Sequence, residues 1–381
     1  MSENAAAENT ITEVQIRRAA IGEHRIASFP IPSLTDGEVL FHVDRFAVTA
    51  NNVTYAAFGD FMKYWNFFPA SSEADVWGIV PVWGFGDVVA SKAEGVALGE
   101  RFYGYFPMAT HLVIQAAKVT PTGMFDSAAH RRDLSPIYNQ YVRVTNDPSY
   151  SADLEGVQML LRPLFTTSFL IDDFLADNSL FHAASVVLSS ASSKTAYGTA
   201  FCLHQRGTVK VVGLTSERNR AFAESLGCYD QVLTYEEVTS LDPEPTVYVD
   251  MSGSGTVRAA VHNHLGDMLT YDCAVGGTHW DAMAPGSGAP LPGPSPQMFF
   301  APSQVQKRNA DWGPAEFALL LANAWTLFLA SVVSAEKPWM TIETVVGAEA
   351  VATCFNAQAT GTASPEIGYV ASVRLLLNGS P

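Results

Sequence analysis

The sequence predicts an α/β protein with two domains, a β-rich domain followed by a doubly wound parallel sheet covered by helices. Three observations predict this fold class. The chain has 381 residues, more than a single domain usually contains. Residues 14–150 alternate in short strands and turn often. After Asp153, continuous apolar strands alternate with helices, which is typical of a parallel sheet buried on both faces.

The β-rich domain is predicted from strands that glycines separate. Residues 38–49, EVLFHVDRFAVT, have a strand pattern, and residues 84–89 continue in the same style. Short strands punctuated in this way favour a barrel-like sheet. The glycines concerned are Gly84, Gly86, Gly95, Gly99 and Gly104.

The parallel sheet is predicted from strand patterns that helix patterns separate. The strands are expected at residues 184–188, 208–213, 246–250 and 267–275, and the helices at 160–174, 194–204, 216–226 and 312–333. The last of these helices contains the most apolar stretch of the chain. Because Asn323 and Thr326 interrupt that stretch, we expect a buried helix there. A helix at 348–358 and a strand at 368–376 close the chain.

The composition argues against several classes of partner. The formal net charge of −16 disfavours nucleic acid and anionic membranes, because both bind a concentrated basic surface. No uninterrupted run approaches about 20 apolar residues, so no membrane span is predicted. Residues 1–13 are polar and acidic and lack the features of a signal peptide, which predicts a disordered tail.

The cysteines do not form a metal-binding motif. They lie far apart, and the sequence has neither a CxxC pair nor HExxH. Scattered thiols are typical of core residues in a reduced protein, so we expect a cytoplasmic protein that binds no metal. The four cysteines are Cys202, Cys228, Cys273 and Cys354.

The segment between the first parallel strand and its helix carries the main binding signal. It reads VVLSSASSKTAYG (residues 186–198), and a doubly wound fold places a phosphate at this helix N-terminus. Serines stand where glycines usually let the backbone approach a pyrophosphate, but hydroxyls and an ammonium bind phosphate directly. The alternative is a serine-rich helix cap followed by an exposed lysine. The predicted contacts are Ser190, Ser192, Ser193, Lys194 and Thr195.

The end of the second parallel strand indicates which dinucleotide would bind. An NAD enzyme normally places an acidic residue there against the ribose 2′-hydroxyl. Here Thr215 and Ser216 occupy that corner and Arg218 follows, which suits a 2′-phosphate and favours NADP(H) over NAD. Glu217 is a competing acid, and the alternative is a helix start with Ser216 as its cap.

The order of a β-rich domain, a βαβ domain and a C-terminal return resembles the medium-chain dehydrogenase/reductase superfamily, most closely its zinc-independent, quinone oxidoreductase-like branch. The stretches that carry the resemblance are VTANNVTYA (48–56), GFGDV (84–88), GERFYGY (99–105), LGCYDQV (226–232) and VDMSG (249–253). Within it, FFAP (299–302) and KRNADWG (307–313) resemble a poorly characterised subgroup, a domain of unknown function.

This resemblance implies a GroES-like catalytic domain, a Rossmann domain, and a cofactor in the cleft between them. We expect the GroES-like domain at 14–155 plus 336–381 and the Rossmann domain at 156–335. The ligands of the zinc-dependent alcohol dehydrogenases have no counterpart here, so no metal is expected to polarise a carbonyl. Dimers are common in the superfamily, so a homodimer is expected by analogy, with the apolar helix near Phe317 as a contributor. The chain departs from the superfamily at the serine-for-glycine fingerprint.

The resemblance also implies candidate catalytic residues. Asn52, Thr54 and Tyr55 lie where related zinc-free enzymes contact the nicotinamide or the substrate. We expect Tyr55 to act as hydrogen-bond donor or proton source and Asn52 to position the cofactor amide. The alternative is that the Asn-Asn pair makes a turn and that Tyr55 packs in the core.

Two further segments are candidates for the substrate pocket. Residues 59–69, GDFMKYWNFFP, are rich in aromatics, and Tyr64 and Trp65 are expected to wall a pocket for an apolar or aromatic small molecule. Gly276 and His279 follow a parallel strand, so they are expected at the nicotinamide end of the cleft. His279 would donate a proton there or cap a turn, and the cap is the favoured reading.

These observations predict an NADP(H)-dependent oxidoreductase that reduces a carbonyl or an activated alkene. One alternative is a binding or regulatory protein that keeps the fold without hydride chemistry. Another is a non-redox lyase or hydrolase, although the sequence has no G-x-S-x-G nucleophile motif.

Overall fold

The computed structural model describes residues 9–275, 291–334 and 336–374, and the chain divides into two compact units. The β-rich unit comprises Met1–Leu160, Ile342–Ala363 and Ile367–Pro381, and the sheet unit comprises Leu161–Thr341 and Ser364–Glu366. The division falls inside helix α3 (Glu155–Asp177), which the two units share.

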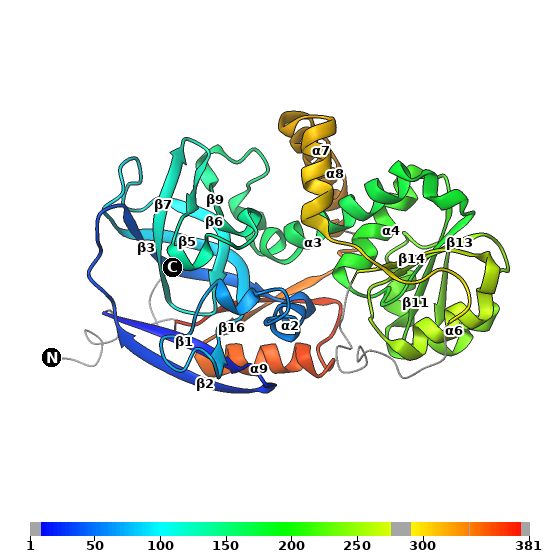
Figure 1. The fold of residues 1–381 in the computed structure, drawn as a ribbon, viewed down its shortest axis with the longest axis horizontal. Coiled ribbons are helices and arrows are strands. Elements are labelled where there is room, and N and C mark those ends of the chain that lie inside the picture. The colour runs from blue at the N-terminus through cyan, green and yellow to red at the C-terminus, as the bar shows by residue number, and fades with distance from the viewer. Residues whose placement is uncertain (1–8, 276–290, 335, 375–381) are drawn as a thin grey trace. The chain divides into compact units, whose positions relative to one another are not determined.

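The β-rich unit contains a closed barrel (Figure 1). Its large sheet has the order β16-β17-β3-β5-β6-β9-β8-β7, and a further pairing of β3 with β7 closes it. The pairing closes the strands from β3 to β7 into the barrel, and β17 and β16 continue the sheet beyond β3. The strands are β3 (Glu38–Val48), β5 (Pro81–Ser91), β6 (Arg101–Pro107), β7 (His111–Thr120), β8 (Gly123–Asp126), β9 (Gln140–Arg143), β16 (Thr341–Val346) and β17 (Ile367–Ser372).

A smaller sheet and two helices complete this unit. The sheet has the order β2-β1-β4, with β1 (Thr10–Arg17), β2 (Ala20–Pro30) and β4 (Trp77–Gly78). The helices are α2 (Ala50–Ala57) and α9 (Ala348–Ala359). An aromatic core fills the barrel, where Phe41 stacks on Tyr141 and meets Phe102 and Phe106 edge to face.

The sheet unit is a six-stranded parallel sheet with the order β12-β11-β10-β13-β14-β15. The strand order reverses between β10 and β13, and ligands of such sheets bind beyond the carboxyl ends at that reversal. The predicted fold class, an α/β chain with a GroES-like β-rich part and a Rossmann sheet, is confirmed. The strands are β10 (Ser185–Leu188), β11 (Lys210–Thr215), β12 (Gln231–Thr234), β13 (Thr246–Asp250), β14 (Leu269–Ala274) and β15 (Gln297–Met298).

The helices of the sheet unit differ from the predicted ones in three places, one of which is α6 (Gly255–Leu265), a helix that was not predicted from the sequence. The single helix expected at 216–226 is a short 3-10 turn, η7 (Glu217–Asn219), followed by α5 (Arg220–Ser225). A further helix precedes the one expected at 312–333, and Gly313 separates the two at a φ of 86° that favours glycine. The remaining helices are α4 (Lys194–Arg206), α6 (Gly255–Leu265), α7 (Ala301–Asp311) and α8 (Pro314–Val332).

Helix α8 is buried on one face only, whereas the sequence predicted a buried helix. Phe328 stacks on Phe165 of α3, and Trp325 packs beside the same ring. Leu319 and Leu327 on the other face are exposed. Because both faces are apolar, the composition alone does not show which face is covered. Within the described residues it is the one helix long and apolar enough to cross a membrane, with a mean hydropathy of 1.6 and 22% of the window buried.

Candidate functional site

The loop after β10 lies at the strand-order reversal and leads directly into α4. Ser193 is the N-cap of α4, and its Oγ accepts a hydrogen bond from the Ala196 amide at 3.3 Å. The Ser193 amide in turn donates to the Ser190 carbonyl at 2.7 Å, so the loop is a tight turn. The cap that formed the alternative interpretation is therefore present, and a helix N-terminus that carries it still attracts anions.

Ser190 has a backbone conformation that is unusual for serine. Its φ of 51° lies in the left-handed region, where the corresponding fingerprint positions normally hold glycine. Its amide donates to the hydroxyl of Tyr235 at 3.3 Å. Tyr235 follows β12, so the tyrosine reaches across the carboxyl edge of the sheet to this amide. A hydroxyl oxygen in that place accepts a hydrogen bond that a phosphate oxygen would also accept.

Lys194 is half-buried, which contradicts the exposed lysine of the alternative interpretation. Its Nζ donates to the Pro365 carbonyl at 3.3 Å, within the same unit. Burial lowers the pKa of Lys194 to about 8. Desolvation of this kind makes an ammonium group favour an anion beside it.

The remaining loop residues take distinct places. The Ser192 hydroxyl accepts from Asn219 Nδ2 at 3.1 Å, which links the loops after β10 and β11. Thr195 is half-buried, and its carbonyl accepts from Ser168 Oγ at 2.8 Å. Ser168 lies on α3, so this contact fixes the first turn of α4 to that helix.

The residues at the end of β11 and directly after it differ in their exposure to solvent. Thr215 is buried at the last position of the strand, while Arg218 is exposed. Ser216 occupies the N-cap position of η7, but its side chain makes no capping hydrogen bond within the part of the chain that the structure describes. Ser216 is therefore not the side-chain cap that the alternative interpretation required.

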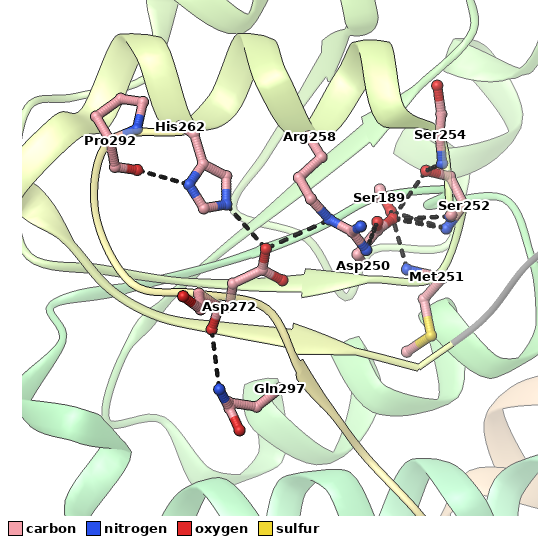
Figure 2. Close-up of polar contacts among 12 residues, drawn as sticks. Ser189, Asp250, Met251, Ser252, Ser254, Arg258, His262, Asp272, Pro292 and Gln297 are labelled. Carbon is pink, nitrogen blue, oxygen red and sulfur yellow. Dashed lines mark hydrogen bonds and ion pairs between the residues drawn. The ribbon is translucent and has the colours of Figure 1, made fainter. Parts of the chain in front are cut away.

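His262 of α6 contacts two hydrogen-bond acceptors. Its Nδ1 lies 2.7 Å from the Pro292 carbonyl oxygen and its Nε2 lies 2.8 Å from Asp272 Oδ2 (Figure 2). A carbonyl and a carboxylate only accept, so a neutral imidazole satisfies one of them and the imidazolium satisfies both. Burial opposes this charge, but the hydrogen bonds to Asp272 and to Pro292 outweigh it and raise the pKa of His262.

Protonation of His262 is expected to make stability depend on pH. A raised folded-state pKa contributes stability that is complete below the ordinary value of 6.5 and is lost as the pH rises through the raised pKa. The midpoint of thermal unfolding of the wild type should therefore fall with rising pH more steeply than that of His262→Gln, which keeps a donor but does not titrate. Parallel slopes for the two proteins between pH 5.5 and 9 would contradict this assignment.

In the β-rich unit, Asn52 of α2 is engaged at both ends of its side chain. Its Oδ1 accepts from the Thr49 amide at 2.7 Å as part of a capping box, and its Nδ2 donates to the Pro81 carbonyl at 2.9 Å. The spacing Thr49-x-x-Asn52 is the signal that predicts such a cap. These contacts give Asn52 a structural role, and its role toward a cofactor amide stays a prediction.

Tyr55 lies one turn further along α2 in an aromatic cluster. Its hydroxyl accepts a hydrogen bond from Trp83 Nε1 at 3.3 Å, and its ring lies 4.7 Å from that of Tyr64 and 5.6 Å from that of Tyr105. Indole only donates, so the Tyr55 proton is directed elsewhere. Burial raises the pKa of Tyr55, which keeps the phenol protonated at physiological pH.

The two residues expected to wall a pocket are both buried. The Tyr64 hydroxyl lies 3.5 Å from that of Tyr138. The Trp65 indole packs against Gly59 and Gly78, where no Cβ would fit, so it fills the core beside the cluster. Trp65 Nε1 has no hydrogen-bond partner among the described residues. Their contact with a substrate stays a prediction.

Two predicted site residues, Gly276 and His279, lie outside the described residues. Among the residues that the structure describes, no group of three or more His, Cys, Asp or Glu side chains is arranged to hold a metal ion. Tyr235 and Asn219 are site residues that the sequence reasoning missed. Tyr235 directly follows β12, and its place at the carboxyl end of a parallel strand was the available signal.

A family model described as "Protein of unknown function (DUF2855)" matches residues 46–364. The chain belongs to the DUF2855 family. That match includes α2, the whole parallel sheet and the loop after β10. The poorly characterised subgroup that the sequence resembles is consistent with this family. A comparison with curated proteins found no match for this DUF2855 member.

Solved structures share the two-part fold of the DUF2855 chain along almost its full length. CurA from Vibrio vulnificus in complex with NADPH has a TM-score of 0.61 and 16% identity, with 95% of this chain and 99% of that chain covered. A putative NADPH:quinone reductase from Mesorhizobium loti has 0.56 and 11%, with 95% and 98% covered. The yhdH oxidoreductase from Salmonella enterica in complex with NADP has 0.52 and 13%, with 95% and 100% covered. These likenesses show that the chain shares the two-part fold of these proteins.

Proposed function

We propose that this DUF2855 protein binds NADP(H) at the carboxyl edge of its parallel sheet and reduces a carbonyl or an activated alkene without a metal. The observation that carries the proposal is the half-buried Lys194 at the start of α4, directly after the loop at the strand-order reversal. Two solved structures with the same fold hold NADPH or NADP, according to their descriptions.

The groups at this edge fit a dinucleotide phosphate. Lys194 is the first residue of α4, and the Ser190 amide donates to the Tyr235 hydroxyl, which a phosphate oxygen would have to displace. A phosphate group accepts hydrogen bonds from an amide, an ammonium and hydroxyls alike. Binding would exchange the Tyr235 oxygen for a phosphate oxygen at the Ser190 amide.

Arg218 supports the choice of NADP(H) over NAD(H). Its exposed guanidinium follows β11, where the ribose 2′-position of a dinucleotide lies in this fold. The competing Glu217 is exposed and lies 3.9 Å from Arg220, which also pairs with Glu224 at 3.2 Å and with Glu237 at 3.0 Å. An exposed guanidinium that is matched to a phosphate adds selectivity more than total affinity.

Arg218→Ala is expected to weaken NADPH binding by about tenfold and to leave NADH binding unchanged, since a charge-assisted hydrogen bond contributes roughly 1.5 kcal/mol or more. Parallel titrations with the two nucleotides measure the difference. Glu217→Ala, the exposed neighbour, serves as the matched control and should not weaken NADPH binding. An equal loss for NADPH and NADH in Arg218→Ala would contradict the assignment of the 2′-phosphate.

When bound, NADPH would supply the hydride. The β-rich unit would then supply the polar group that the reduced oxygen or carbon needs. The phenol of Tyr55 accepts from Trp83, stays protonated because of its burial, and so has a proton to donate. Tyr64 and the surrounding aromatic cluster suit an apolar or aromatic substrate.

Turnover tests this proposal. The purified protein should oxidise NADPH in the presence of a quinone, an α,β-unsaturated ketone or an aromatic aldehyde, with no added metal and with chelator present. A protein that binds NADPH but turns over no member of such a panel would favour the alternative, a fold-retaining binding protein. The Tyr235 hydroxyl at the Ser190 amide favours that alternative, because it occupies a donor that a phosphate needs.

A further inference from the structure

Ser189, the residue that directly follows β10, is fully buried, and its hydroxyl uses its donor position and both of its acceptor positions. Its Oγ donates to Asp250 Oδ1 at 2.7 Å. The same oxygen accepts from the amides of Met251 at 2.9 Å and Ser252 at 3.0 Å (Figure 2). A hydroxyl has one donor and two acceptor positions, so this one has no capacity left for a phosphate.

The buried carboxylate of Asp250, the last residue of β13, accepts hydrogen bonds from several groups around Ser189. Besides Ser189, its Oδ1 accepts from the Ser252 hydroxyl at 2.8 Å and from the Gly253 amide at 3.0 Å. Its Oδ2 accepts from Arg258 Nη2 at 2.6 Å. A carboxylate with this many donors stays ordered in the interior.

The contacts continue away from the loop across the sheet edge. Arg258 Nε lies 3.4 Å from Asp272 Oδ2, and the same carboxylate oxygen bonds His262, which holds the Pro292 carbonyl. Two aspartates, Asp250 and Asp272, therefore alternate with Arg258 and His262. Figure 2 shows this row of side chains running along one face of the strands, with Ser189 at one end.

We infer that Ser189 is a positioning residue, whose side-chain tie to Asp250 holds the phosphate loop in the shape that a glycine fingerprint holds through its backbone. The inference rests on the proposed function, since it assigns the purpose of the loop to dinucleotide binding. Ser189 directs its hydroxyl toward β13, and the next residue turns into the left-handed conformation that presents its amide to Tyr235. The side chain of Ser189 therefore positions the loop, as the backbone of a glycine fingerprint does.

The two interpretations make opposite predictions for Ser189→Gly. If the serine merely replaces a better glycine, restoring glycine should preserve or strengthen NADPH binding. If the serine ties the loop, glycine removes three hydrogen bonds and adds backbone freedom, so NADPH binding should weaken by about tenfold or more. The KM for NADPH should rise, while kcat at saturating NADPH should stay near the wild-type value.

Ser185→Gly is the matched control, because it makes the same change at the other end of β10 and likewise removes a buried contact with β13, that of the Ser185 hydroxyl with Thr246 Oγ1 at 2.8 Å. Ser185 lies at the amino end of the strand, away from the phosphate loop, so the NADPH dissociation constant should change by less than about threefold even if stability falls. Ser189→Ala keeps the backbone restricted and removes only the hydroxyl. It should weaken NADPH binding as well, and it replaces Ser189→Gly if that variant does not fold.

A second readout does not depend on NADPH. The amides of Met251 and Ser252 donate to the Ser189 hydroxyl, so their hydrogen exchange should be faster in Ser189→Gly and Ser189→Ala than in the wild type and Ser185→Gly. Unchanged exchange, or NADPH binding in Ser189→Gly as tight as in the wild type, would overturn the inference. If the wild type binds no NADPH, the proposed function and the positioning role fail together, and faster exchange would still establish the tie as structural.

Discussion

Tyr55→Phe is expected to lower kcat by about 10²–10⁴-fold while leaving the dissociation constant of NADPH unchanged, because a positioned proton donor contributes about that much. The phenol accepts from Trp83 and keeps its own proton, and burial raises its pKa, so the donor form persists across the working pH range. Steady-state rates with NADPH and an activated alkene, combined with a binding titration, separate the two effects.

Tyr141→Phe is the matched control for this prediction. Tyr141 is also a buried tyrosine of the β-rich unit, and its hydroxyl donates to the Tyr105 carbonyl at 2.7 Å. Its loss should lower the unfolding midpoint by a few degrees, since one buried hydrogen bond contributes roughly 1 kcal/mol, but should leave kcat within about twofold. A Tyr55→Phe enzyme with wild-type kcat would remove this tyrosine from the chemistry.

Lys194→Met is expected to weaken NADPH binding by about 10- to 100-fold, the usual contribution of a charge-assisted hydrogen bond to a phosphate. Methionine preserves much of the side-chain volume in a half-buried position and removes the charge. Lys210→Met is the control, because Lys210 begins β11 at the opposite edge of the sheet and pairs with Asp242 at 2.7 Å. Binding by calorimetry should be unaffected in that control.

The pH dependence of binding tests the same lysine. Burial lowers the pKa of Lys194 to about 8, so the free protein loses this positive charge as the pH rises above 8. A bound phosphate stabilises the charged form and raises that pKa, so binding should take up a proton above pH 8 and weaken as the pH rises further. Calorimetry in two buffers of different ionisation enthalpy measures the uptake. Proton-independent binding in the wild type, identical to that of Lys194→Met, would contradict the assignment.

Strands and fold class could be predicted because long apolar runs and their alternation with helices depend on the local sequence. The contacts of individual side chains could not be predicted, because they depend on which strands become neighbours in the sheet. Ser189 follows a predicted strand, but only the pairing of β10 with β13 places Asp250 beside it. Tyr235 lies 45 positions beyond Ser190 and meets it only because β12, β11 and β10 are neighbours.

Burial was also difficult to predict from the sequence where polar residues flank a tight turn. Lys194 was open to interpretation as an exposed residue, and only the packing of the segment that contains Pro365 shows that it is covered. By contrast, the capping box of Thr49 and Asn52 has a sequence signal, and its recognition would have predicted the structural contacts of Asn52.

The measurement that tests the central claim most directly is a calorimetric titration of the wild-type protein with NADPH and, separately, with NADH. We expect a micromolar dissociation constant for NADPH and clearly weaker binding of NADH, because the edge of the sheet offers a half-buried ammonium, a helix N-terminus and an exposed guanidinium to phosphate groups. Binding of neither nucleotide would contradict the account and leave a protein that shares the reductase fold without its cofactor.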